Sequence, residues 1–198
     1  HSPRHWVTLT TDTKRDLDWW LSLLPSWNGV APLLHPSWTP PSHLHLFTDA
    51  SLTGYGGMCE EEWFAEPWPP ATQEWADSMS WMEMIPLLAA CALWGPAWAG
   101  LRVTFHCDNS GVVGACAKGW SHDPRIMSLL RQLCYLAAHH SFIFRVQHVA
   151  GHDNDTADAL SRLQLSRFRR LMMMMMIPQT NRKGHTRRSQ TRTNFYKA

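Results

Sequence analysis

The sequence predicts one α/β domain with an additional segment at each end. Between about residues 44 and 162, short apolar runs of strand type alternate with longer segments of helical spacing. The length of 198 residues and the hydrophobic content of 44% are sufficient for one core of ordinary size. The ends differ in composition, because a Pro/Ser/Trp-rich stretch precedes the alternating region and a run of Met and basic residues follows it. We therefore divide the chain into residues 1–42, 43–170 and 171–198.

The first segment, 1–42, is predicted to be a connecting segment that contains one helix. This helix runs from Thr11 to Leu24 and ends at Pro25. Residues 26–42 are rich in Pro, Ser and Trp, which indicates an irregular connector. The predicted apolar side of the helix consists of Leu17, Trp20, Leu21 and Leu24.

Three strands are predicted to open the domain. Residues 44–48 form an apolar run that leads to Asp49 and a turn rich in Ser and Gly. Residues 55–59 and 63–66 form the next two strands, with an acidic turn at 60–62 between them. Asp49 therefore lies at the end of a buried strand, where its carboxylate would face a cleft.

A helix is predicted from Ser80 to about Trp94. Ser80 and Glu83 have the spacing of a capping box, and Pro86 strains the early turns. Residues 84–101 carry no charge over 18 positions, which approaches the length of a membrane span. Two Pro and two Gly in this stretch favour a buried core helix instead.

The remainder of the domain continues the alternation of strands and helices. Asp108-Asn109-Ser110 ends one strand and caps a short helix, and Asp123-Pro124 opens a longer one. The predicted elements are a strand at 102–107, a helix at 111–118, a helix to about 138, a strand at 141–149 and a helix from about 156. The apolar side of the longer helix consists of Ile126, Leu129, Leu130, Leu133 and Leu136.

The cysteines indicate a reducing compartment. The five of them have neither Cys-x-x-Cys nor zinc-ligand spacing. Their odd number and apolar neighbours predict reduced, buried thiols, and the N-terminus has no apolar leader. We expect an intracellular protein of the cytoplasm or nucleus that is not secreted. The chain also lacks an initiator Met, so we interpret it as a fragment.

The C-terminal tail differs in charge from the rest of the chain. Residues 1–161 carry 8 basic and all 16 acidic residues, a net charge of −8, whereas residues 162–198 carry 10 basic residues and no acid. Such asymmetry is typical of chains that handle a polyanion, although a solvated tail without a partner is the simpler interpretation. We expect residues 171–198 to be disordered or a non-native end of the coding sequence.

Four carboxylates are spaced so that they can converge from different elements. These are Asp49, Glu83, Asp108 and Asp158. Two divalent ions held by such oxygen ligands about 4 Å apart activate water and neutralise phosphate charge in phosphodiester hydrolysis. Taken singly, each acid is explained as a turn former or a helix cap, but the ordered set favours a metal site.

Four stretches carry a resemblance to a known family. They are Thr48-Asp49-Ala50-Ser51 with the glycines that follow, Trp81-Met82-Glu83, His106-Cys107-Asp108-Asn109, and residues 148–162 with their ending Asn-x-x-Ala-Asp-Ala-Leu-Ser-Arg. They resemble ribonuclease H domains, especially the ribonuclease H region of DIRS-like, tyrosine-recombinase retrotransposon reverse transcriptases. The resemblance covers about residues 44–170, and residues 6–42 resemble the segment that links a polymerase region to it.

The resemblance implies a fold and a metal site. It implies a ribonuclease H-like fold, with a five-stranded mixed sheet whose first three strands are antiparallel, flanked by helices. It also implies that Asp49, Glu83, Asp108 and Asp158 bind two Mg²⁺ ions, with Mn²⁺ as a possible substitute. Asp153 and Asp155 are the competing fourth acids. His148 would assist proton transfer or product release, with His152 as the competing choice and a loop histidine without a chemical role as the simpler one.

The implied substrate is RNA paired with DNA, recognised through its 2′-OH groups in the minor groove. Small polar residues near the acids suit close approach, so Ser51, Asn109 and Asn154 are the predicted substrate contacts. Turn and cap chemistry is the alternative explanation for these residues. The basic side chains that bind the phosphate backbone would come from the arginines after position 161 or from the polymerase region of the same polyprotein.

We therefore expect an RNA–DNA hybrid ribonuclease from a retroelement reverse transcriptase, and no membrane partner. The alternative is an inactive or captured ribonuclease H-like domain that binds nucleic acid or a protein partner. Another nuclease or a resolvase on the same fold is a third interpretation. The chain contains no Asp-Asp pair, so we expect no polymerase activity from it.

Overall fold

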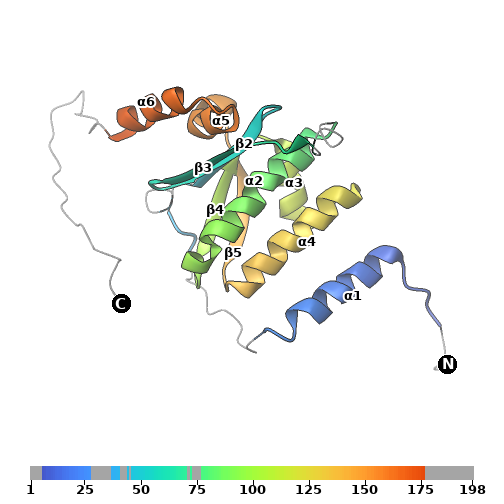
Figure 1. The fold of residues 1–198 in the computed structure, drawn as a ribbon. Coiled ribbons are helices and arrows are strands. Elements are labelled where there is room, and N and C mark those ends of the chain that lie inside the picture. Colours follow the sequence, from blue (N-terminus) through green and yellow to red (C-terminus); the bar gives the residue numbers. More distant parts are fainter. Residues whose placement is uncertain are drawn as a thin grey trace.

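The computed structural model describes residues 6–27, 37–40, 44, 46–70, 72 and 77–176. Figure 1 shows three consecutive strands followed by a mixture of helices and two further strands. In order they are α1 (Thr11–Leu23), β1 (Leu46–Ala50), β2 (Gly54–Cys59), β3 (Glu62–Pro67), α2 (Met79–Trp94), η2 (Gly95–Trp98), β4 (Arg102–Cys107), α3 (Ser110–Lys118), α4 (Pro124–His139), β5 (Ile143–His148), η3 (Gly151–Asp153), α5 (Asp155–Ser161) and α6 (Leu165–Met176).

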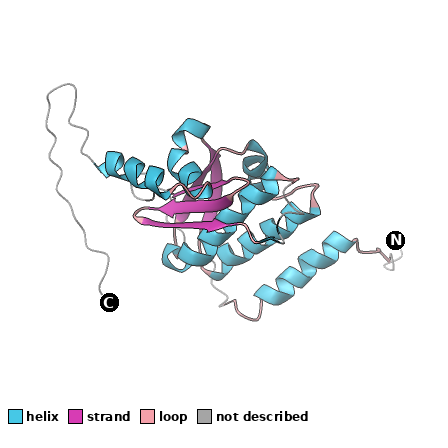
Figure 2. Cartoon of the chain, turned by 45° about the horizontal axis from the view of Figure 1, so that its top comes forward, coloured by secondary structure: helices cyan, strands magenta, loops and turns pink. Residues whose placement is uncertain are grey.

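The five strands form one mixed sheet in the order β3-β2-β1-β4-β5 (Figure 2). β1 pairs with β2, and β2 with β3, in antiparallel fashion. β4 pairs in parallel with both β1 and β5. The predicted fold class, a ribonuclease H-like α/β fold with a five-stranded mixed sheet and antiparallel first strands, is confirmed by this order and these directions.

Side chains of β1 and β2 alternate between two apolar layers, as the two-residue period of a strand requires. Leu46 and Cys59 are partners in the sheet and belong to the core under α2, α3 and α4. Phe47 and Met58, the next pair, belong to the smaller core under α5 and α6. The sheet is therefore covered by helices on both sides (Figure 1).

Helix α2 starts earlier than predicted. Ser78, not Ser80, is the N-cap residue, and its hydroxyl accepts the backbone N–H of Trp81. The hydroxyl of Ser80 instead donates to Oδ1 of Asn109. The predicted capping box is thus wrong, and Glu83 lies in the second turn of the helix, past its capped end. Half of the apolar residues of α2 are buried and several others pack against the core, which confirms the core helix. No helix in the described part of the chain is long and apolar enough to span a membrane.

Helix α1 is confirmed, but it packs on a different side from the one predicted. Leu17, Trp20, Leu21 and Leu24 are exposed by 47–67%. The helix lies along α4 (Figure 1), where Nε1 of Trp19 donates to the carbonyl of Arg131 at 2.8 Å. Asp16 accepts from the same arginine, also at 2.8 Å. Because the outer side of α4 is polar, α1 docks through the indole of Trp19, ion pairs and the buried Leu23 near the end of α4, and the predicted apolar side faces outward.

Two further predictions change in part. The prediction of a disordered segment from residue 171 is wrong for residues 171–176, because α6 continues through them and Leu171 and Met172 pack on the smaller core. Residues 177–198 and most of the connector at 26–42 lie outside the described residues. All five cysteines are free thiols as predicted, but Cys134 is exposed rather than buried.

Candidate active site

Asp49 is a buried carboxylate near the end of β1, on the side of the sheet that α5 covers. It is only 4% exposed. The hydroxyl of Ser161 donates to its Oδ2 at 2.5 Å, and Nδ2 of Asn154 lies 3.4 Å from its Oδ1. Burial raises the pKa of Asp49 to about 7, against the lowering effect of the Ser161 hydrogen bond and with repulsion from Asp108 and Asp158.

A glycine allows α5 to reach Asp49. Gly56 faces Asp49 across the β1–β2 pair. A Cβ atom on Gly56 would lie 2.5 Å from Cβ of Leu160, so the helix rests directly on the backbone of β2. This close approach brings Asn154 and Ser161, at the two ends of α5, onto the same carboxylate.

Glu83 approaches the same site from the other layer of helices. It is 4% exposed and accepts the backbone N–H of Ala50, the last residue of β1. Burial raises its pKa to about 9, with additional repulsion from Asp49 and Asp108. Burial is the main cause of this raised pKa, and a cation near Glu83 would offset the smaller part that comes from repulsion by Asp49 and Asp108.

Asp108 follows the last residue of β4 and is half-buried. Phe47 of β1 is paired with His106 of β4, and Asp49 and Asp108 lie two residues further along these parallel strands. One carboxylate oxygen each of Glu83 and Asp108 and Sγ of Cys107, the atoms that could bind a metal ion, all lie within 4.8 Å of one another. The structure therefore brings together the first three predicted acids, and it adds the thiol of Cys107.

Asp158, in the first turn of α5, is close enough to Asp49 to repel it electrostatically, but its own oxygens are already paired. Nε of Arg162 donates to Oδ1 at 2.7 Å, and Nη1 of Arg167 donates to Oδ2 at 2.6 Å. Burial acts to raise the pKa of Asp158, but the hydrogen bonds from the two arginines outweigh it, so the net pKa is lowered. Of the competing acids, Asp155 accepts from Arg167 and Asp153 is exposed beside His152.

The two candidate histidines differ in their positions relative to the acids. His148 is the last residue of β5, is exposed, and is paired in register with Cys107, the neighbour of Asp108. His152 lies in η3 with its side chain 82% exposed, and its Nε2 is 3.4 Å from Asp153. His148 thus ends the strand that lies beside β4, which Asp108 follows.

The three predicted substrate contacts are mostly occupied within the protein. Ser51 is 6% exposed, and its hydroxyl donates to the carbonyl of Ser161 at 2.9 Å. Asn154 is fully buried and holds Thr48 and Asp49. Oδ1 of Asn109 caps α3 through the N–H groups of Gly111 and Val112. Turn chemistry therefore accounts for Ser51 and helix capping for Asn109, whereas Asn154 makes long-range contacts to β1 and no side-chain cap on α5. Of the three residues, Asn109 is half-buried and the other two are buried.

Sequence reasoning missed the roles of Ser161, Cys107 and Arg167. Ser161 stands three residues after Asp158 in the Asp-Ala-Leu-Ser-Arg run, and Cys107 directly precedes Asp108. These neighbouring positions could have been noticed. Arg167 belongs to a different helix from Asp158, and nothing in the local sequence pairs the two.

Comparisons with known proteins add little to the geometry. No family model and no curated protein matches the chain. Among solved structures, ribonuclease H1 from the halophilic archaeon Halobacterium salinarum NRC-1 is similar at 16% identity, with 61% of this chain and 97% of that chain covered and a TM-score of 0.48. The N-terminal ribonuclease H domain of rv2228c from Mycobacterium tuberculosis, a fusion with maltose-binding protein, is similar at 17% identity, with coverages of 58% and 91% and a TM-score of 0.45. Because both TM-scores are below 0.5, the fold assignment rests on strand order and direction.

The donor set suits a hard divalent cation. Asp49, Glu83 and Asp108 offer carboxylate oxygens, the ligands that Mg²⁺ and Mn²⁺ prefer. Burial raises the pKa of Asp49 and of Glu83, so the charged form of each carboxylate is disfavoured unless a cation lies near it. These three residues could hold one ion, whereas both oxygens of Asp158 are paired with arginines in this structure.

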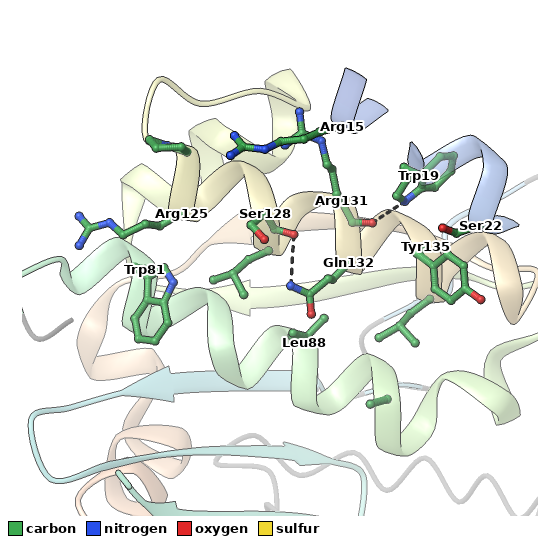
Figure 3. A pocket seen from close by; sticks show the side chains of 14 residues that line it. Arg15, Trp19, Ser22, Trp81, Leu88, Arg125, Ser128, Arg131, Gln132 and Tyr135 are labelled. Atoms are coloured by element: carbon green, nitrogen blue, oxygen red, sulfur yellow. Dashed lines mark hydrogen bonds between the residues drawn. The ribbon is translucent and has the colours of Figure 1, made fainter. Parts of the chain in front are cut away.

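A cavity of about 1000 Å³ lies elsewhere, between α1, α2 and α4 (Figure 3). Trp19 and Arg131 meet in it through the hydrogen bond that docks α1, and Trp81 and Tyr135 also line it. None of the four acids belongs to its lining. The cavity lies where α1 packs against α2 and α4, and it is separate from the carboxylate site.

Proposed function

We propose that the chain is an endonuclease that hydrolyses the RNA strand of RNA–DNA hybrids, with two divalent ions held by Asp49, Glu83, Asp108 and Asp158. The observation that carries the proposal is the convergence of acids from β1, α2, β4 and α5 near the carboxyl ends of the central strands β1 and β4. Asp49 and Glu83 are buried there with pKa values raised to about 7 and 9, in part by repulsion among these acids. Charge gathered in this way is typical of functional sites.

When bound, two Mg²⁺ ions would supply an activated water and neutralise charge on the phosphate. The chain's own residues would orient the ligands for them. Ser161 and Asn154 hold both oxygens of Asp49, and the Ala50 N–H holds Glu83. His148, exposed at the adjacent strand end, would carry a proton to or from the leaving group.

We also propose that the domain derives from a retroelement reverse transcriptase and acts beside a polymerase region of the same polyprotein. The support is the resemblance of residues 44–170 and of the segment that precedes them. An acidic domain needs basic side chains to bind a hybrid. Arg162 and Arg167 contact Asp158, and Arg169 and Arg170 follow as exposed residues of α6.

The test is cleavage of a labelled RNA–DNA hybrid with Mg²⁺, compared with the same substrate in EDTA. Asp49→Asn and Asp108→Asn should each lower the cleavage rate by at least about 100-fold, because each removes a charged ligand without changing its shape. Asp153→Asn, at the exposed acid beside His152, is the matched control and should cleave normally. Cleavage that survives both ligand substitutions would show that these acids do not perform the reaction.

One observation favours the alternative, an inactive domain that binds nucleic acid or a partner. Both oxygens of Asp158 are paired with arginines, as in a purely structural ion pair. Filter binding of a hybrid by the full chain and by a chain ending at Met176, which keeps α6, separates the tail from the domain. Hybrid binding that needs residues 177–198, without any Mg²⁺-dependent cleavage, would support this alternative.

A further inference from the structure

The two arginines on Asp158 are held very differently. Arg162 follows α5 and has its side chain 52% exposed, with Nε donating to Oδ1 of Asp158. Arg167 comes from α6 and is 33% exposed. It donates to Oδ2 of Asp158, to Asp155 at 3.0 Å and to Oε1 of Gln164 at 3.2 Å. Arg167 is therefore fixed by three partners, whereas Arg162 has one hydrogen bond to Asp158.

Helix α6 keeps Arg167 in place independently of its ion pairs. Phe168, the next residue, is 3% exposed and packs with Met58 and Leu160 in the smaller core. Its ring centroid lies 5.3 Å from that of Trp63 in β3. Because the helix is anchored to the sheet by this apolar contact, it presents Arg167 to Asp158 from a rigid position.

Arg162 lies close enough to Asp49 for their charges to interact. Its positive charge interacts favourably with Asp49 as well as with Asp158. A cation shared by Asp49 and Asp158 would occupy the same region and would repel the guanidinium. A half-exposed arginine with one hydrogen bond to a carboxylate leaves at small cost, since exposed ion pairs are weak.

We propose that Arg162 is an exchangeable counter-ion, which occupies the cation position between Asp49 and Asp158 and yields it to the second divalent ion. Arg167 remains in place and keeps Asp158 oriented. The exchange makes the second ion the weaker one and so sets the Mg²⁺ concentration at which the site becomes complete. This inference deepens the proposed function and rests on it.

The experiment compares two substitutions, each of which removes one positively charged partner of Asp158. Mn²⁺ binding to the full chain is measured by calorimetry and by electron paramagnetic resonance at pH 7 and constant ionic strength. Arg162→Gln should tighten the weaker class of Mn²⁺ sites by about threefold to fivefold more than Arg167→Gln does. Arg162→Lys, which keeps the charge, should stay near the wild-type affinity.

Arg169→Gln, an exposed change on α6, controls for the general loss of a positive charge. Thermal melts by circular dichroism verify that each variant is folded. As a second readout, the Nε–H resonance of Arg162 should shift on Mg²⁺ addition while that of Arg167 stays. Equal Mn²⁺ affinities for Arg162→Gln and Arg167→Gln would overturn the exchange, since simple electrostatics would then suffice.

Cleavage of the hybrid, measured separately, distinguishes the two proposals. A selective effect of Arg162→Gln on Mn²⁺ binding, in a chain that cleaves no hybrid, would support the exchange and reject the proposed function. Normal cleavage with equal Mn²⁺ affinities in both variants would reject only the exchange. Absence of any Mn²⁺ binding would contradict both.

Discussion

The hydroxyl of Ser161 lies 2.5 Å from Oδ2 of Asp49, and it contributes more than the Arg162 charge does to ionisation of a carboxylate that burial drives toward neutrality. The two residues are far apart in the sequence and meet because α5 rests on β1 and β2. A single buried hydroxyl thus supports the charge on which metal binding at Asp49 would depend.

Replacing Ser161 with alanine should raise the pKa of Asp49 above its value of about 7, because the carboxylate loses a donor while remaining buried. Titration of the metal-free protein, followed by ¹³C NMR of the Asp carboxyl carbons, measures this directly. In the cleavage assay, the acidic limb of the pH–rate profile should move to higher pH. Ser166→Ala, at an exposed position of α6, is the control. An unshifted Asp49 titration would mean that the hydroxyl does not set the charge state.

The same burial predicts that the metal-free protein loses stability as pH rises. Asp49 goes from an ordinary pKa of 3.8 to about 7 on folding, and Glu83 from 4.5 to about 9. An acid whose pKa is raised in the folded state binds its proton more tightly there, so folding is favoured at low pH and loses this advantage as pH rises through the folded-state pKa. The loss should extend from about pH 4 to pH 9.

Asp49→Asn should therefore increase the free energy of unfolding at pH 8 by roughly 2–4 kcal/mol in EDTA, with little effect at pH 4. Urea unfolding at both pH values provides the measurement. Saturating Mg²⁺ should stabilise the wild type at pH 8 more than the variant, because the ion offsets the repulsion. Equal stability of the two proteins at pH 8 would show that Asp49 is not under electrostatic strain.

Local patterns predicted the sheet well, and tertiary docking determined what they missed. The strand at 102–107 and the apolar side of α4 follow from alternation and helical spacing, which neighbouring residues fix. The leucine stripe of α1 obeyed the same helical spacing, yet the helix docked through Trp19 onto a polar side of α4. The spacing of apolar residues cannot predict which side of a helix packs against a neighbouring helix when the contact surface of that neighbour is polar.

The candidate site likewise contains residues that local patterns predicted and contacts that depend on tertiary docking. Asp49 and Asp108 were predictable, because parallel strands that end together bring their next residues together. The pairing of Asp158 with Arg167 depends on the path of α6 back over the sheet, which Phe168 determines by burial. Ser51 and Asn154 were assigned to substrate because they flank acids, but burial turned their polar groups inward.

Gly56→Ala tests the close approach of α5. The added methyl group would meet Cβ of Leu160 at 2.5 Å, so the helix must shift or the strand must bend. We expect a loss of about 1–3 kcal/mol in the free energy of unfolding and weaker Mn²⁺ binding, since Ser161 moves with the helix. Gly114→Ala, in α3 with nothing within 4 Å of its Cβ, should instead stabilise by about 0.5–1 kcal/mol. Equal effects of both changes would show that α5 can move without cost.

His148 and His152 are separated by an activity comparison. His148 ends β5 opposite Cys107, next to Asp108, whereas His152 projects from η3 beside Asp153 with 82% of its side chain exposed. A proton carrier must lie within reach of the reacting groups, so His148→Ala should lower the hybrid cleavage rate by about 10- to 100-fold at saturating substrate. His152→Ala should leave the rate within about twofold of wild type, because exposed loop substitutions rarely act at a distance. The reverse result would place the proton carrier on η3, and equal small effects would leave proton transfer to water.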